Sequence, residues 1–403
     1  MRNLEERPLI PKRTLTRWAG LLATSAIVFA ACSSTGGTSA APSAAAASAA
    51  APSAAAASGA TASGADLTKL IADAKAEGTL STIALPHDWC NYGQIIDAFK
   101  AKYGLAVNEL NPDAGSGDEI EAVKANKDNP GPQAPDVIDV GITYGDPAKT
   151  DKLIQPYKVS TWDTIDPKLK DPDGYWYGDY YSILTFESNK AAVANTPQDW
   201  ADLLKPEHKN QVALAGDPRA SSQAYNAVYA AALANGGSLD DAAPGLQFFK
   251  QLNDAGNFVP TIAKPGTIDT GSTPITIRWA YNALAHKDLA AGNPEIDVVV
   301  PASGRFQGVY AQAISAYAPH PNAAKLWMEY LYSDDGGQAG WLKGYCHTTR
   351  LADLTARGVH SDLIAKLPDI SGAVYPNAEQ AAAAKTLITE QWDTVVGVDV
   401  VPQ

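Results

Sequence analysis

The sequence predicts an α/β protein of two doubly wound lobes joined by a hinge. Residues 66–403 are too many for one small hydrophobic core, which favours two lobes. Between residues 66 and 142, segments with helical periodicity alternate with short apolar segments, as in a parallel sheet covered by helices. A second alternation of this kind begins near Gln211.

The first α/β unit opens with a helix in which Leu67, Leu70 and Ile71 share one face and Gly78 marks the end. The same reasoning predicts helices at 66–77, 91–103 and 118–126, and strands at 80–85, 105–110 and 136–142. Ligands of such sheets bind beyond the carboxyl ends of the strands. Those ends are expected at 86–91, 111–117 and 143–146.

The second unit follows an aromatic, extended segment from Trp176 to Ser188, of the type that links two lobes. Its predicted strands are 211–215, 274–279 and 296–300, and its predicted helices are 222–234 and 240–255. Beyond it we expect a strand at 310–317 and helices at 322–332 and 377–396. The lobes are assigned as follows: lobe 1 to about 66–185 and 305–345, and lobe 2 to about 186–304 with part of the C-terminal helices.

Residues 1–31 have the pattern of a secretory signal peptide. A basic start precedes an uncharged run, Trp18 to Ala31, that is too short to span a bilayer as a permanent helix. The run ends Phe29-Ala30-Ala31-Cys32, and small residues directly before a cysteine resemble a bacterial lipobox. We therefore expect Cys32 to be lipidated and to become the mature N-terminus. The alternative is an ordinary signal cleaved nearby, with Cys32 as a bystander.

Residues 32–65 are predicted to be a tether. From residue 33 onward this segment has no charge and consists mostly of Ala, Ser, Thr, Gly and Pro, with APSAAAAS at 41–48 and again at 51–58. It has almost nothing to bury and cannot offset its ordering entropy. A flexible chain of this length spans roughly 30 Å. We expect the globular domain, 66–403, to be extracytoplasmic and lipid-anchored to the cell membrane, facing the periplasm or the cell surface.

Charge and composition exclude several classes of function. The formal net charge is -13, and it becomes -16 when residues 1–31 are removed. An acidic protein is a poor partner for nucleic acid or for anionic lipid surfaces, and its charge suits a protein that meets small or cationic solutes. We also expect the protein to be a monomer. No GxSxG, SxxK, HExxH or P-loop motif occurs, and we expect neither catalysis nor a cofactor.

Two cysteines, Cys90 and Cys346, remain after Cys32. In an exported protein an isolated pair is more typical of a disulfide than of a metal site. No CxxC motif and no cluster of His and Cys accompanies them, and we assign no metal ligand.

Four stretches, in this order, resemble the extracellular solute-binding proteins of bacterial ABC importers, of the ferric, polyamine and thiamine type. They are EGTLSTIALPHDWCNYGQIIDAFKAKYG (77–104), APDVIDVGITYGDPA (134–148), PITIRWAYNALAHKDLAAG (274–292) and YAQAISAYAPHPNAAKLWMEYLYSDDGGQAGW (310–341). The resemblance implies a type II periplasmic-binding-protein fold whose lobes close on a solute and deliver it to a permease and ATPase complex. It also places the segment around Cys346 near the same cleft as Cys90.

The loop at 86–92 carries Asp88, Trp89 and Tyr92 at the end of a predicted strand. A carboxylate, an indole and a phenol suit an organic cation, through charge pairing and a cation–π contact of about 0.5–2 kcal/mol. The alternative is that Asn91 caps a helix and Trp89 closes the edge of the lobe.

Further candidates stand at helix starts and strand ends. Ser116 and Ser222 lie at predicted helix N-termini, which suit anionic or polar ligand atoms; the alternative is plain capping. Arg278 and Trp279 lie where the family that the chain resembles often places ligand residues. Arg278 can hold a carboxylate or phosphonate bidentately, and its alternative is a surface or interlobe ion pair.

Three tyrosines, Tyr144, Tyr180 and Tyr310, complete the predicted binding set. Side chains alternate along a strand, so of Tyr180 and Tyr181 at most one is expected to face the cleft.

The first hypothesis is a receptor for a small polar organic solute, amine-bearing and polyamine-like. Ferric ion is the second. Ferric-binding relatives typically use an adjacent tyrosine pair in the region matching 274–282, where this chain has Arg278, Trp279 and only Tyr281. An exported lipid-anchored enzyme and a structural surface lipoprotein are the remaining alternatives.

Overall fold

The main sheet is mixed, and one long strand runs through its middle. The computed structural model describes residues 64–402, and in this part of the chain the main sheet has eight strands along the path β3-β9-β5-β7-β6, with β4, β8 and β10 attached beside it. A separate parallel pair is formed by β1 and β2. The strands are β1 (Thr79–Ile83), β2 (Ala106–Leu110), β3 (Val137–Gly141), β4 (Ile154–Gln155), β5 (Trp176–Asn189), β6 (Val212–Leu214), β7 (Ile275–Trp279), β8 (Ile296–Val299), β9 (Gln307–Ser315) and β10 (His347–Thr348).

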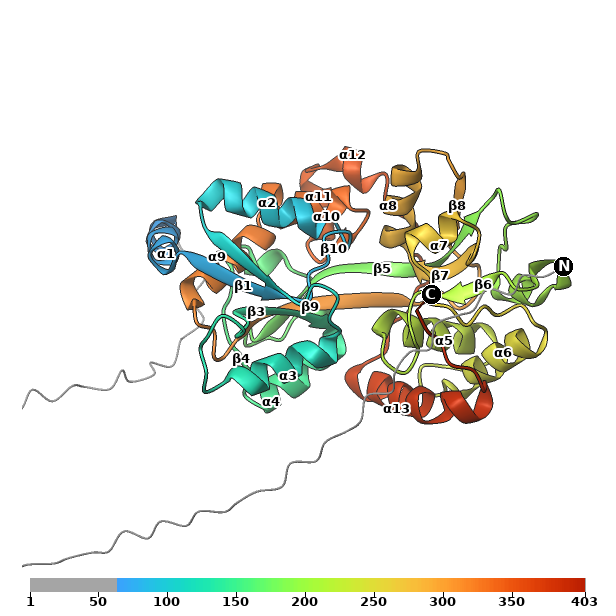
Figure 1. Cartoon of the computed structure of the whole chain (residues 1–403). Coiled ribbons are helices and arrows are strands. Elements are labelled where there is room, and N and C mark those ends of the chain that lie inside the picture. Colours follow the sequence, from blue (N-terminus) through green and yellow to red (C-terminus); the bar gives the residue numbers. More distant parts are fainter. Residues whose placement is uncertain (1–63, 403) are drawn as a thin grey trace, which may run out of the picture. The chain divides into compact units, whose positions relative to one another are not determined.

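Strand β5 is the segment predicted to link two lobes, and it changes partners along its length. Its first half, Trp176 to Ile183, pairs antiparallel with β9, and Tyr180 and Tyr181 pair with β10 on the other side. From Leu184 onward β5 pairs instead with β7 and β8. Figure 1 shows β5 and β9 side by side between the two groups of elements. Lobe 1 is therefore built around β1–β4, β9, β10 and the first half of β5, and lobe 2 around β6–β8 and its second half.

Helices cover both lobes, and most lie within a few residues of the predicted positions. They are α1 (Gly64–Glu77), α2 (Tyr92–Tyr103), α3 (Ser116–Asn126), α4 (Gly145–Thr150), α5 (Ser222–Ala234), α6 (Ala243–Asp254), α7 (Pro265–Asp269), α8 (Ala280–Ala290), α9 (Pro321–Leu331), α10 (Ala339–Lys343), α11 (Leu351–Arg357), α12 (Ser361–Ile364) and α13 (Ala378–Val395). The C-terminal helix α13 packs on α6 and α5 of lobe 2 and also contacts the segment after β3 in lobe 1.

Lobe 1 is assembled from two separate stretches of the globular chain, an early one and a late one. Its strand β9 lies between β3 and β5, and helix α9 packs on α1. The carboxylate of Glu77, the last residue of α1, accepts the backbone N–H groups of Asn322 and Ala323 in the first turn of α9. A carboxylate at a helix N-terminus pairs with N–H groups that have no intrahelical partner. This contact fixes the C-terminal part of the lobe against its first helix.

The sequence prediction did not include helix α8, the short helices α4, α7 and α10–α12 or the strands β4 and β10, and two further features differ from it. Strands β3, β7 and β8 pair antiparallel with β9 or β5, because these long strands return between the lobes, so the sheet is not purely parallel. The helix predicted at 240–255 begins at Ala243, where the Asp241 carboxylate accepts its backbone N–H at 3.0 Å and Pro244 occupies the first turn.

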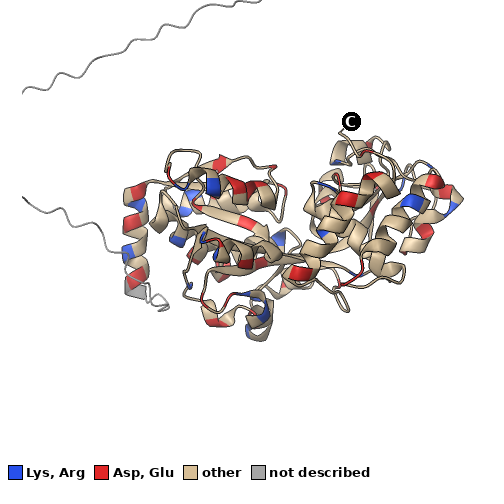
Figure 2. Ribbon diagram, turned by 90° about the horizontal axis from the view of Figure 1, so that it is seen from below, with Lys and Arg blue, Asp and Glu red and all other residues tan. Residues whose placement is uncertain are grey.

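Acidic and basic side chains are interspersed over the helices and loops of both lobes in the described part of the chain (Figure 2). Within residues 64–402, no helix is both long enough and apolar enough to cross a membrane. The predicted signal, Cys32 and the predicted tether as far as residue 63 lie outside the described residues, whereas Gly64 and Ala65, also assigned to the tether, belong to α1.

The predicted disulfide is present. Cys90 and Cys346 are joined with 5.7 Å between their Cα atoms, across a sequence separation of 256 residues. Both cysteines are buried. The bond ties the loop after β1 to the segment between α10 and β10, which are the early and late parts of lobe 1.

Removing this disulfide is expected to lower the free energy of unfolding by about 2–4 kcal/mol, because the reduced unfolded chain regains the freedom that so long a loop had lost. The comparison is chemical unfolding of the parent and of the double variant Cys90→Ala, Cys346→Ala, with reduced parent as the control. Equal stabilities for all three would show that the bond does not constrain the fold.

Candidate functional site

The loop between β1 and α2 is fixed by its neighbours. Beyond the disulfide, the Asn91 side chain donates to the carbonyl oxygen of Gly340 at 3.1 Å. Cys90 and Asn91 have φ angles of 43° and 67°, a region that non-glycine residues adopt at an energetic cost. Gly344 lies so close behind that a Cβ atom there would come within 2.6 Å of the Cys90 carbonyl carbon. Trp89, the residue before Cys90, is therefore held in one place.

Four aromatic side chains meet where the lobes join, and we call them the aromatic cluster: Trp89, Tyr180, Tyr281 and Tyr310. Trp89 contacts Tyr281 and Tyr310 edge-on, with ring centroids 5.7 Å apart in each pair. Tyr180 stacks on Tyr310 at 5.2 Å and meets Tyr281 edge-on at 6.0 Å. Trp89 comes from lobe 1, Tyr281 from the first turn of α8 in lobe 2, and the other two from β5 and β9. The cluster thus bridges the lobes.

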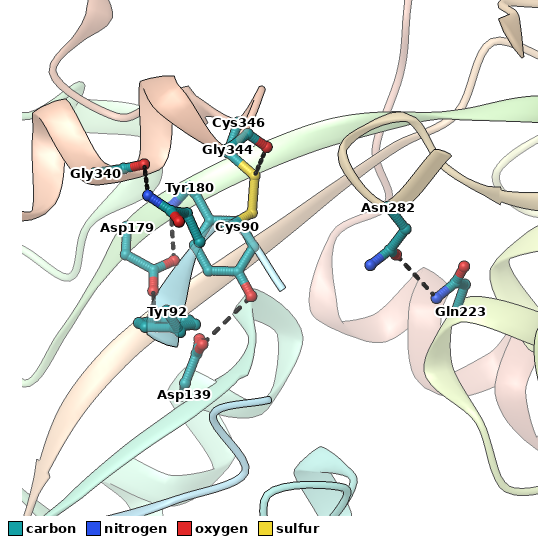
Figure 3. The surroundings of a disulfide bond; sticks show 11 residues. Cys90, Tyr92, Asp139, Asp179, Tyr180, Gln223, Asn282, Gly340, Gly344 and Cys346 are labelled. Carbon is teal, nitrogen blue, oxygen red and sulfur yellow. Dashed lines mark hydrogen bonds between the residues drawn. A yellow bond between two sulfur atoms is a disulfide. The ribbon is translucent and has the colours of Figure 1, made fainter. Parts of the chain in front are cut away.

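Next to the aromatic cluster lies a set of buried polar side chains, which we call the carboxyl network: Glu119, Asp139, Asp179, Tyr92 and Gln312. The Tyr92 hydroxyl donates to Asp179 Oδ2 at 3.0 Å. Gln312 Nε2 donates to the Tyr92 hydroxyl at 2.9 Å. The Tyr180 hydroxyl donates to Asp139 Oδ2 at 3.3 Å and so connects this network to the aromatic cluster (Figure 3).

The acids of the carboxyl network are strongly perturbed. Burial raises the pKa of Asp139 well above its usual range, and the charges of Asp179 and Glu119 raise it further. Burial also raises the pKa of Glu119 well above its usual value, and it raises the pKa of Asp179 to about 7. Glu119 Oε2 accepts the backbone N–H of Asp139 at 2.8 Å. The carboxyls of this network therefore lose their protons at a higher pH than exposed carboxyls do.

Lobe 2 contributes the N-terminal turns of α5. Ser221 caps the helix by accepting the N–H of Ala224 at 3.4 Å, which leaves the side chain of Ser222 outside the cap. Gln223 Oε1 accepts the backbone N–H of Trp279 at 3.2 Å, and its amide nitrogen lies 3.5 Å from Asn282 Oδ1 (Figure 3). Gln223 thereby fixes the start of α5 beside the start of α8.

Two hollows lie between the end of β3 and lobe 2, and both are lined by Thr143 and Tyr225. The inner one, about 30 Å³, has room for about two water molecules. The outer one, about 530 Å³, is within the usual size range of small-molecule sites. The inner hollow is further lined by Gly141, Ile142, Ser222, Asn226, Phe306–Tyr310, Tyr375 and Pro376, and the outer one by Tyr144, Pro147 and residues of α13.

Two polar contacts bridge the lobes, and the first lies beside the outer hollow. Lys385 Nζ on α13 donates to the Tyr144 hydroxyl, after β3, at 2.6 Å. The hydroxyl of Tyr345, next to the disulfide, donates to the carboxylate of Asp288 on α8. Each bridge joins lobe 1 to an element of lobe 2, so the structure represents a conformation in which the lobes are in contact.

Several predicted site residues come together in this region. Trp89, Tyr180 and Tyr310 form most of the aromatic cluster, Ser222 lines the inner hollow and Tyr144 the outer one. As expected from strand alternation, the side chains of Tyr180 and Tyr181 lie on opposite sides of β5. Tyr181 stacks on His347, with ring centroids 5.2 Å apart. Trp279 is 1% exposed and packs so tightly on Gly308 of β9 that a Cβ there would lie 2.4 Å from its ring.

Other predicted residues have different roles. Tyr92 is fully buried in the carboxyl network. Ser116 begins α3, and its hydroxyl accepts the backbone N–H of Gly141 at 3.0 Å, which positions the end of β3. Asp88 is exposed on the loop that carries Trp89.

Arg278 forms an ion pair with another side chain of the protein. Its guanidinium lies 3.2 Å from Glu187 Oε2, and Glu187 also pairs with His286, which in turn lies 3.1 Å from Asp269. Arg278 is 7% exposed and Glu187 fully buried. Burial lowers the pKa of His286, but the bond to Glu187 opposes this and the pKa ends above its usual value. Arg278 therefore forms an ion pair, which was the alternative to its role as a ligand residue. The pair lies within lobe 2 and is neither at the surface nor between the lobes.

Asp139 and Gln312 are absent from the predicted set. Asp139 lies inside the apolar strand sequence VIDVG. Burying an acid in such a strand costs free energy unless a hydrogen bond or a charge offsets it, so its presence indicates a functional role. That signal is available in the sequence. Gln312 has no comparable signal, because its position opposite Asp139 arises from the pairing of β3 with β9, which are far apart in the chain. Within residues 64–402, no group of three or more His, Cys, Asp or Glu side chains is arranged to hold a metal ion.

Comparison with known proteins identifies the class. Residues 133–345, more than half of the chain, match the family model of bacterial extracellular solute-binding proteins. The chain therefore belongs to this family, whose members are extracytoplasmic receptors for small solutes that work with ABC permeases. An uncharacterized protein of Haemophilus influenzae is 26% identical over 260 residues, which are 61% of this chain and 71% of that protein.

Solved structures show the same fold. The periplasmic binding protein AfuA from Actinobacillus pleuropneumoniae, with fructose-6-phosphate bound, has a TM-score of 0.60 at 21% identity, covering 79% of this chain and 98% of that one. Iron-bound HitA from Pseudomonas aeruginosa gives 0.55 at 16% identity, over 76% and 98% of the two chains. The spermidine/putrescine-binding protein PotD from Streptococcus pneumoniae gives 0.50 at 14%, over 81% and 93%. At these identities the likeness shows the type II periplasmic-binding-protein fold alone.

Replacing Arg278 by alanine is expected to lower the free energy of unfolding by about 3–5 kcal/mol, because Glu187 would be left buried without its cationic partner. Urea unfolding measures the loss. The double variant Arg278→Met, Glu187→Gln should recover much of the stability, since it removes both charges. A fully stable Arg278→Ala variant would show that the residue is free to serve a ligand.

Proposed function

We propose that this protein captures a small polar organic solute bearing a protonated amine between its lobes and delivers it to an ABC permease and ATPase complex. The aromatic cluster supports this most directly. Trp89, Tyr180, Tyr281 and Tyr310 come from both lobes and from the strands between them, so closing the lobes assembles an electron-rich wall. Such walls attract organic cations by about 0.5–2 kcal/mol per contact.

The surroundings supply the rest of the recognition. The carboxyl network places acidic groups behind the cluster, and the exposed Asp88 lies on the same loop as Trp89. On the opposite side, the start of α5 with Ser222 offers N–H groups and the positive end of a helix dipole to any hydroxyl or anionic group of the solute. Trp279 supports this wall from beneath, as its packing on Gly308 indicates.

Ferric ion is the second candidate solute. Three phenols, those of Tyr180, Tyr281 and Tyr310, belong to one cluster beside Asp139, and oxygen donors of this kind suit a hard cation. One protein of the same fold is described as iron-bound HitA. Against this candidate, the adjacent pair Tyr180 and Tyr181 is divided between the two sides of β5.

A calorimetric and thermal-shift screen of polyamines, amino acids, aminophosphonates, thiamine and ferric citrate tests the solute class. We expect an amine to bind, and Trp89→Ala to weaken it about 10-fold or more, because apolar contact is lost together with the cation–π term. Trp89→Phe should lose less. Asp88→Asn should weaken cations more than neutral compounds, but only modestly, since an exposed charge is screened. Tight ferric binding that survives Trp279→Ala and disappears in Tyr180→Phe would establish iron instead.

We also propose that the mature chain is anchored through lipidated Cys32, on the tether 32–65. The sequence pattern before Cys32 and the extracytoplasmic family support this assignment. In fractionated cells, the parent is expected with the membranes and the Cys32→Ala variant in the soluble extracytoplasmic fraction. Identical partitioning of the two would contradict the anchor.

A further inference from the structure

The carboxyl network contains three acidic side chains that are buried close to one another. Glu119, Asp139 and Asp179 are 1%, 4% and 0% exposed. Their hydrogen-bond partners within residues 64–402 are backbone N–H groups, tyrosine hydroxyls and an amide, and none is a cationic side chain. Buried carboxylates without a cation are costly, and native proteins usually pair them. The structure holds an excess of negative groups at one place.

Unpartnered polar atoms face the same place. Asp139 Oδ1, Gln312 Oε1 and the Tyr281 hydroxyl are all buried and have no hydrogen-bond partner in the described part of the chain. Gln312 lies directly opposite Asp139 in the pairing of β3 with β9. Burial, the neighbouring Tyr310 and the charge of Asp139 raise the pKa of Tyr281, so the field of Asp139 reaches this residue of lobe 2. Two acceptors and a hydroxyl without partners are what a bound ammonium group would satisfy.

Simultaneous ionisation of Asp139 and Asp179 is disfavoured, because both carboxyls are buried and no cationic side chain is hydrogen-bonded to either within residues 64–402. Each carboxyl shifts the pKa of the other. The titratable groups that face them are Glu119 on α3 and five tyrosines, none of which provides a positive charge: Tyr92 on α2, Tyr180 on β5, Tyr281 on α8, Tyr310 on β9 and Tyr332 after α9. When two carboxyls share a buried site, one of them retains its proton. This pair therefore holds a proton near neutral pH.

We propose that Asp139 is the subsite for the protonated amine of the solute, and that binding the amine displaces the proton held by the Asp139–Asp179 pair. This inference rests on the proposed function and adds a site and a stoichiometry to it. In the step, the carboxyl O–H bond breaks and its proton passes to the solvent. The ammonium group then donates an N–H to the carboxylate it leaves behind. One positive charge enters and one departs, so the buried site keeps its net charge.

The aromatic cluster provides the route. Tyr180 donates to Asp139 and at the same time contacts Tyr281 and Tyr310. Because Trp89 belongs to lobe 1 and Tyr281 to lobe 2, separating the lobes parts these two rings and opens the way to Asp139. Closure then places the Tyr281 hydroxyl over the bound amine.

Because one proton leaves for each amine bound, the affinity should depend on pH. Where the pair is protonated, each fall of one pH unit should weaken amine binding about 10-fold, and the dependence should flatten above the pKa of the pair. Calorimetry with putrescine and with every other amine that binds, in two buffers of different ionisation enthalpy, counts the protons. We expect about one proton released per solute in the parent.

The variant Asp139→Asn has the same shape but has neither a proton to release nor a negative charge. We expect it to release no proton and to bind the amine about 30-fold more weakly, or worse, as for other truncated buried charge pairs. Asp97→Asn is the matched control, because it removes an exposed carboxylate of lobe 1 that is 75% accessible. It should bind and release a proton as the parent does.

Infrared difference spectroscopy tests the proton without any solute. Near neutral pH the parent should show a protonated-carboxyl C=O band beyond any band that Glu119 contributes to parent and variant alike. This additional band should be absent from Asp139→Asn and lost when the amine is added. Absence of the band in the parent, or amine binding without proton release, overturns the inference and leaves the proposed function standing. If no amine binds, the proposed function fails and the inference fails with it. Proton counting on the parent decides the matter even if Asp139→Asn does not fold.

Discussion

The backbone hydrogen bonds of β5 are the constraint on which the rest of the protein depends. One continuous strand pairs with β9 and β10 in lobe 1 and, from Leu184 onward, with β7 and β8 in lobe 2. The lobes can therefore change their relative position only by deforming β5 and its neighbour β9. Tyr180 and Tyr310 stand on these two strands and stack on one another. The floor of the proposed binding region is thus part of the connection itself, and a solute bound as proposed would contact the element that must bend.

The chemistry of the proposed site follows from an apolar, aromatic surface that lies next to a group of buried acids. On one side, aromatic rings and tightly packed backbone exclude water; on the other, three acids are retained at a high cost in solvation. Low dielectric surroundings strengthen any interaction between these acids and a cation. Arg278, the cation nearest in sequence to this region, is neutralised within lobe 2 by Glu187, which also pairs with His286. The protein thereby keeps its own positive charge away from the place where a cationic solute is proposed to bind.

Local patterns in the sequence predicted the elements better than the contacts between them. Periodicity gave the order of helices and strands in lobe 1, and alternation separated Tyr180 from Tyr181. The start of α6 was misplaced because Asp241 and Pro244 set it through capping, which the apolar pattern does not reveal. The partner of Arg278 lies 91 residues away, and Gln312 meets Asp139 only through strand pairing. Such long-range pairings have no local signature, so the candidate residues were only partly identified.

The discontinuous construction of lobe 1 has a consequence for how the chain reaches its native state. The sheet of lobe 2 is complete within β5 to β8, residues 176–299. The sheet and the disulfide of lobe 1 cannot be completed before β9, α9 and Cys346 are available, and Cys346 lies 256 residues beyond Cys90. Contacts of such separation slow folding, because a long loop must close before they form. As the chain emerges from the membrane, lobe 2 is thus free to acquire structure first, while the unpaired edge of β3 and the thiol of Cys90 stay exposed. The native disulfide of lobe 1 therefore cannot form until Cys346 has also emerged.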